Sequence, residues 1–177
     1  MKFESNQLLD DLSKLTNANI SAAEEFSKLS LEQLNFRAKE DSWSILECLE
    51  HLNLYGNFYI PEIEKAIKKS NSKPAEIFKS GWAGNYFAES MKPKEKLNKM
   101  STFKDKNPLG SKLDTKVIDK FLDQQKNMLY LLKKAKEVNL NKIRTSITLP
   151  ILTFKLGDTF RFVIYHNERH IVQAKCI

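Results

Sequence analysis

Apolar residues recur at helical spacing in four long stretches of the chain. The first stretch covers residues 6–28, the second covers 42–69, the third covers 114–138, and the fourth is capped by Thr153 or Asp158. Side chains three or four residues apart lie on one face of a helix, so each stretch predicts a helix with a buried face. Four such helices predict an all-α fold, a four-helix bundle.

Polar residues indicate where these helices begin. Ser5 is the expected N-cap of the first helix. Ser30 opens a Ser-x-x-Gln sequence that has the form of a capping box. Either Ser42 or Ser44 can cap the second long helix, and Ser44 with Glu47 three residues later also fits a capping box. Pro61 lies inside the second helix, where it removes one backbone hydrogen bond and predicts a kink. Residues 160–165 are apolar nearly all round, which predicts a buried last helix.

Residues 70–113 lack the helical pattern. A short helix is expected over 82–91, and the lysine-rich stretch 92–112 is expected to be irregular. A connection of about forty residues is far longer than a helical hairpin needs. It predicts a long irregular crossover between the second and third helices, which would let those two helices run parallel. The whole chain, residues 1–177, is expected to form a single domain.

Composition agrees with this fold class. The chain is 41% hydrophobic and 29% charged, as in ordinary globular proteins, and its five Gly and five Pro are few for a turn-rich β protein. Two cysteines do not indicate a disulfide framework. Neither a membrane span nor a signal peptide is recognisable, so a cytoplasmic location is expected.

The net charge of +7 is concentrated in the second half of the chain. Its lysines are spread along helix faces and loops, without the dense basic stripe that nucleic-acid binding would favour. We therefore expect neither nucleic acid nor membrane as a partner. The same positive field would assist an anionic small-molecule substrate.

Three histidines carry the strongest chemical signal. His166 and His170 lie four residues apart in a helical segment, so their imidazoles leave the same face one turn apart. His51 lies in the second helix, and we expect the fold to bring it against this pair. Neutral imidazole suits zinc, nickel, copper and iron(II), and three protein ligands leave a position open for water or substrate. The alternative is that these are ordinary core or surface histidines.

Several neighbours are candidates for roles beside such a site. Glu47 and Tyr55 flank His51 by one turn on either side, and Gln173 follows His170 by three residues. These three are the candidates for catalytic roles, either by orienting a metal ligand or by contacting substrate. The alternatives are helix capping for Glu47 and core packing for Tyr55.

Three further residues near the histidines have simpler interpretations. Cys48 could be a fourth ligand, but a small apolar core residue is the favoured interpretation. Arg169 is expected to pair with an acidic side chain or to contact a substrate anion. Trp43 is expected to anchor the start of the second helix in the core.

Two sequence segments resemble the metal motifs of the DinB/YfiT-like superfamily. The segment Trp43–Leu52 has its tryptophan and serine ahead of a helix with one His, and His166–Gln173 has His-x-x-x-His followed by Gln. The preceding Leu156–Phe160 resembles the usual entry to the last helix. The resemblance implies an up-down-down-up four-helix bundle with a divalent metal, often nickel or zinc, held by His51, His166 and His170.

The resemblance also implies a class of activity. Understood members are similar to metal-dependent transferases of low-molecular-weight thiols such as bacillithiol, mycothiol or glutathione, and to a thiol-dependent isomerase. The leading hypothesis is therefore a thiol S-transferase that acts on an electrophilic small molecule. The alternatives are a hydrolase using a metal-bound water, or a non-catalytic bundle that binds a metal or small molecule. The resemblance also makes a homodimer plausible.

Overall fold

The computed structural model describes residues 1–93, 102–149 and 151–177, so part of the stretch 92–112 lies outside the described residues. The described chain is mostly helical and adds two small sheets. In chain order the elements are β1 (Lys2–Glu4), α1 (Ser5–Phe26), α2 (Leu31–Asn35), α3 (Ile45–Lys68), β2 (Ile77–Lys79), α4 (Trp82–Met91), the 3₁₀ helix η1 (Lys104–Lys106), α5 (Lys116–Ala135), β3 (Arg144–Ser146), β4 (Thr153–Lys155) and α6 (Leu156–Lys175). The expected helical class is thus confirmed.

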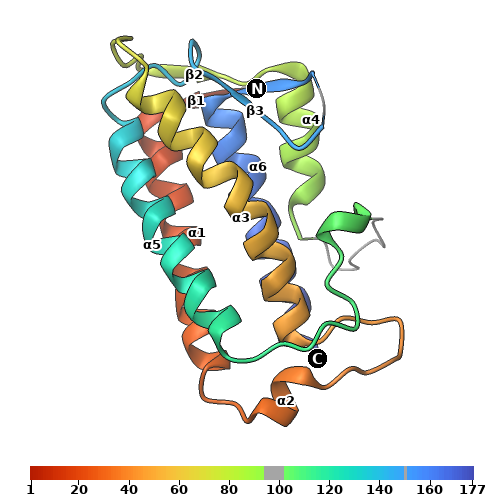
Figure 1. Cartoon of the computed structure of the whole chain (residues 1–177). Helices are drawn as coiled ribbons and strands as arrows, with labels where there is room; N and C mark the ends of the chain where they lie inside the picture. Colours follow the sequence, from red (N-terminus) through yellow and green to blue (C-terminus); the bar gives the residue numbers. More distant parts are fainter. Residues whose placement is uncertain (94–101, 150) are drawn as a thin grey trace.

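The four long helices α1, α3, α5 and α6 lie alongside one another (Figure 1). Both α1 and α3 pack against α5 and against α6, while α4 covers α6 from the other side. Buried apolar side chains from all four fill the space between them, with Leu12, Ile63, Leu132 and Ile164 in one cluster. Among the described residues, no helix is both long enough and apolar enough to span a membrane.

Two predicted capping boxes are confirmed. Ser30 caps α2 together with Gln33, and Ser44 caps α3 together with Glu47; in each pair the serine hydroxyl accepts the third backbone N–H and the partner side chain accepts the serine N–H. The short helix expected over 82–91 is α4. Helix α3 continues through Pro61, and the kink there stays a prediction.

The expected cap of the first helix is wrong. Glu4, not Ser5, caps α1, because its carboxylate accepts the backbone N–H groups of Asn6 and Gln7. The Ser5 hydroxyl instead donates to the carbonyl of Ala75 at 2.6 Å. The residue therefore joins the start of α1 to the segment that precedes β2.

The expected caps of the last helix are also wrong. Strand β4 runs directly into α6, which begins at Leu156 without a side-chain cap, so Gly157 lies inside the helix. Thr153 belongs to β4. The Asp158 carboxylate accepts the Gly81 N–H at 2.8 Å and the Ser80 hydroxyl, so it serves a tertiary contact with the β2–α4 connection.

The two antiparallel sheets were not expected from the sequence. β1 pairs with β2, with Phe3 opposite Phe78, and β3 pairs with β4, with Thr145 opposite Phe154. Each strand has three residues, which is too short for a period-two pattern to be recognised. The sheets cover the end of the molecule at which α6 begins (Figure 1).

Candidate metal centre

The fold brings the three histidines together. His51 projects from α3, and His166 and His170 project from α6, with one ligand nitrogen from each within 4.8 Å of the others. The Nε2 atoms of His51 and His166 are 3.2 Å apart. His51 and His166 are only 2% and 6% exposed, and His170 is partly buried. The group therefore has the compactness that a shared metal ion requires.

Hydrogen bonds fix how two of the rings present their nitrogens. His51 Nδ1 lies 2.7 Å from the carbonyl of Lys106, which can only accept, so Nδ1 carries the proton and Nε2 keeps its lone pair. His170 Nδ1 likewise donates to Gln173 Oε1 at 2.9 Å. In both residues Nε2 is then the nitrogen available to a metal. The hydrogen bond at Nδ1 fixes the tautomer of each ring, as is usual for metal-ligating histidines.

Burial keeps the imidazoles neutral. It lowers the pKa of His51 to about 4, helped by the nearby Lys106 charge and opposed by the hydrogen bond to the Lys106 backbone. It lowers the pKa of His170 to about 3 and that of His166 well below its usual value, with smaller contributions from the neighbouring histidines. Because metals bind the neutral ring, the three side chains are in the required protonation state at neutral pH.

The donor set fits a divalent metal. Without one, the 3.2 Å contact needs a proton, which His166 Nε2 would donate to the lone pair of His51 Nε2. A metal held by both would take the place of this proton. Three imidazole nitrogens suit nickel, zinc, copper or iron(II), and the set leaves coordination positions for other ligands.

A cavity of about 830 Å³ opens beside the histidines. All three line it, together with Trp43, whose ring centroid is 4.6 Å from that of His51 and 5.5 Å from that of His170. The Trp43 Nε1–H donates to Asn107 Oδ1 at 3.1 Å. Trp43 therefore forms part of the wall of the site as well as standing at the start of α3.

Tyr55 and Gln173 both line the cavity. The Tyr55 ring centroid is 4.7 Å from that of His166, and burial raises the pKa of its phenol, so the hydroxyl stays protonated at neutral pH. Gln173 is engaged with His170 as described above. Arg169, which directly precedes His170 on α6, also lines the cavity and is 5% exposed. The catalytic roles of Tyr55 and Gln173 stay predictions.

The Glu47 side chain lies one turn before His51 on α3 and is buried. Its carboxylate accepts from Arg37 Nε at 2.9 Å and Nη2 at 2.5 Å, from the Ser44 N–H at 2.8 Å and from the Gly110 N–H at 2.6 Å. These contacts cap α3 and hold the crossover against it. Glu47 is not among the described residues that line the cavity, so its placement agrees with the capping alternative.

Cys48 belongs to the hydrophobic core between α3 and its neighbours. Burial raises the pKa of its thiol to about 12, with a smaller contribution from the Glu47 charge. In the described part of the chain it is not part of the group that could hold a metal. Its placement agrees with the interpretation as a small apolar core residue.

Two features of the site were not recognised in the sequence. One is the carbonyl of Lys106, which comes from the crossover and orients His51; no sequence signal identifies a backbone group of this kind. The other is Phe162, which lies one turn before His166 and lines the cavity beside it. The four-residue spacing places Phe162 on the same face of α6 as His166, and this was the sequence signal that could have drawn attention to it.

Comparison with known proteins places these residues in a family. The model of the DinB superfamily matches residues 14–174, which include all three histidines. No curated protein and no solved structure matches the chain at a significant level. The family match spans most of the chain and covers all of α3 and all but the last residue of α6. The chain therefore belongs to the DinB superfamily.

Proposed function

We propose that the chain is a divalent-metal-dependent enzyme that transfers a low-molecular-weight thiol to an electrophilic small molecule. Nickel or zinc would be held by His51, His166 and His170. The observation that supports this most is that three neutral imidazoles, two buried and one partly buried, converge at the wall of a cavity of about 830 Å³. Structural metal sites are closed by four protein ligands, whereas catalytic sites combine three ligands with access for substrate.

In the proposed reaction, a carbon–sulfur bond replaces the S–H bond of the thiol. In a substitution, the S–H bond and the bond from carbon to its leaving group break, a C–S bond forms, and the proton departs with the leaving group. In an addition to an enone, the S–H bond and the C=C π bond break, and C–S and C–H bonds form on the two neighbouring carbons. When bound, the metal would supply a Lewis acid that lowers the pKa of a thiol or a water molecule. A cavity of this volume is in the range of small-molecule sites, which have about 300–1,000 Å³.

The residues around the histidines would orient the metal ligands and contact the substrate. The Lys106 carbonyl and Gln173 hold the rings of His51 and His170 in fixed orientations. Tyr55 lines the cavity with a phenol that burial keeps protonated, so its hydroxyl could contribute a hydrogen bond to a bound substrate. Arg169 brings positive charge to the cavity wall, which would favour an anionic group on the thiol.

We also propose that α1, α3, α5 and α6 form an up-down-down-up four-helix bundle. The packing of α1 and α3 against both α5 and α6 supports this arrangement. In Figure 1, α1 and α6 run towards the end that carries the C-terminus, whereas α3 and α5 begin there. The long segment between α3 and α5 would be the crossover that such an arrangement needs.

The test is a transfer assay on nickel- or zinc-loaded protein. Bacillithiol, mycothiol and glutathione would be supplied with activated aromatic halides and enones, and the thioether product would be measured. We expect turnover with one thiol, lost in His166→Ala and retained in Glu168→Ala, a change on the same helix outside the histidine group. Ester or amide cleavage without thiol would favour a hydrolase, and bound metal without turnover would favour a binding protein.

A further inference from the structure

The cavity beside the histidines has two chemically different parts. Among its described lining residues, the charged ones are Lys39, Asp41 and Arg169, which come from the loop before α3 and from the second half of α6. These segments also carry Trp43 and His170. The remainder of the described lining carries no charged side chain and is dominated by aromatic and aliphatic groups. The charged groups of the described lining are thus gathered on the segments that carry Trp43 and His170.

The apolar part continues the two helical stripes that carry the histidines. On α3, Tyr59 lies two turns after His51, and on α6, Phe162 lies one turn before His166. The ring centroids of Tyr59 and Phe162 are 5.7 Å apart, across the two helices. The Phe162 ring is nearly parallel to that of His166, with centroids 6.1 Å apart. The stripes therefore lead from the histidines to an aromatic surface.

Helix α4 and strand β4 complete this surface. The ring of Phe154 lies 6.0 Å from that of Phe162 and 5.7 Å from that of Phe87, centroid to centroid. Met91, one turn after Phe87 on α4, also lines the cavity. We call the part of the cavity lined by Tyr59, Phe87, Met91, Phe154 and Phe162 the aromatic arm.

The polar group of Tyr59 does not make the arm hydrophilic. The backbone N–H of Thr148 donates to the Tyr59 hydroxyl at 3.3 Å, and the Thr148 Oγ1 lies 3.4 Å from it. This hydroxyl is therefore engaged by the β3–β4 connection. A charged ligand group in the arm would lose its hydration without gaining a charged partner from the described lining, whereas an apolar group would gain contact with the rings.

We propose that the aromatic arm binds an uncharged aromatic or alkyl group. The identification of this group as the part of the substrate that carries the electrophilic carbon rests on the thiol-transfer function proposed above. The binding preference itself rests on the lining of the arm alone. The arm adjoins His166, so a ligand in it would hold its reactive end beside the histidine group.

The test is a titration of the metal-free protein with the neutral fluorophore N-phenyl-1-naphthylamine, whose emission rises in apolar surroundings. We expect saturable binding of one probe per chain, with the same affinity after addition of nickel or zinc. Phe87→Asp should weaken this binding by at least tenfold, because it places a carboxylate in the wall of the arm. Leu149→Asp should also weaken it, because Leu149 lines the cavity next to Thr148, which contacts Tyr59 of the arm.

Tyr86→Asp is the matched control, since Tyr86 adjoins Phe87 on α4 but is 63% exposed. It should leave the affinity unchanged. Absence of saturable binding, or weakening by Tyr86→Asp without weakening by Phe87→Asp, would overturn the inference. Circular dichroism spectra of all variants would establish that each is folded.

The readout separates this inference from the proposed function. Probe binding in the arm without thiol transfer would support the binding preference and count against the enzyme. Thiol transfer that shows no preference for apolar electrophiles, and that Phe87→Asp leaves unchanged, would overturn the role of the arm and leave the enzyme intact.

Discussion

Replacing Arg161 with methionine should destabilise the fold by about 3 kcal/mol, because the guanidinium is the centre of a buried ionic network. Arg161 is 0% exposed. Its Nη1 lies 3.1 Å from Asp158 Oδ1 and 2.9 Å from Ser80 Oγ, and its Nη2 lies 2.6 Å from Glu89 Oε1 and 3.1 Å from Asn85 Oδ1. The network joins the first turns of α6 to α4, and so supports two of the helices that line the aromatic arm.

The magnitude follows from what the substitution leaves behind. Loss of one partner of a buried ion pair costs about 3–5 kcal/mol, since the other charge stays buried without compensation. Asp158 is 0% exposed but would keep its bonds to Ser80 and Gly81, and Glu89 is 35% exposed and can be hydrated. These two facts place the cost near the lower value. For a domain of this size, about 3 kcal/mol lowers Tm by about 6–12 °C.

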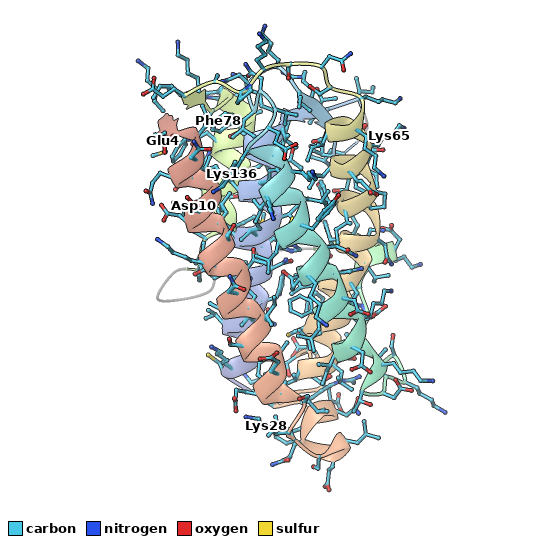
Figure 2. All side chains as sticks on the ribbon, turned by 90° about the vertical axis from the view of Figure 1, so that its left-hand side faces the viewer. Glu4, Asp10, Lys28, Lys65, Phe78 and Lys136 are labelled. Atoms are coloured by element: carbon cyan, nitrogen blue, oxygen red, sulfur yellow. The ribbon has the colours of Figure 1, made fainter. Side chains whose placement is uncertain are left out.

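Urea unfolding followed by circular dichroism would measure this cost. Lys136→Met is the matched control, because Lys136, directly after α5, pairs with Asp10 on α1 at the same 2.6 Å, but on the exposed surface (Figure 2). It should cost less than about 1 kcal/mol. A double variant, Arg161→Met with Asp158→Asn, should cost less than the sum of its single changes. Additive costs, or a cost for Arg161→Met as small as the control's, would refute the reasoning.

Three further predictions concern the site and its surroundings. Iodoacetamide should modify Cys176 in the native chain but not Cys48, whose pKa is raised to about 12 by burial; two modified thiols in folded protein would contradict this. The metal-free chain should lose stability as the pH falls below 6.5, because unfolded histidines bind protons there while folding lowers the pKa of His51 to about 4; urea midpoints that stay constant from pH 7 to pH 5 would disagree. Nickel should quench the emission of Trp43, 4.6 Å from the His51 ring, most visibly in a Trp82→Phe variant, and unchanged emission would place the metal elsewhere.

Much of the histidine group could be predicted because helical spacing is a local property. The four-residue spacing of His166 and His170 determines that both rings leave the same face of α6. That His51 meets them depends on how two helices pack, which the sequence indicated through the buried side of each helix and through the family resemblance. The position of Trp43 against two of the rings depends on the loop before α3, for which no periodicity exists.

Elsewhere in the fold, local sequence patterns predict only the contacts that form between residues close in the chain. Ser44 caps α3 as its sequence predicts, because the capping box is formed entirely within four residues. Asp158 has the right chemistry for a cap, but Gly81 and Ser80, nearly eighty residues away in the chain, take its carboxylate. The aromatic arm could not be predicted for a related reason: the spacing shows that Phe162 is apolar and buried, but not that it borders a cavity.

The most direct test of a three-histidine metal centre is the metal content of protein purified without a histidine tag. We predict about one equivalent of nickel or zinc per chain, either as purified or after addition, and its loss in His51→Ala and in His166→Ala. Glu168→Ala should retain the metal. A wild-type chain that neither contains a metal nor takes one up, or variants that bind as well as the wild type, would contradict the account.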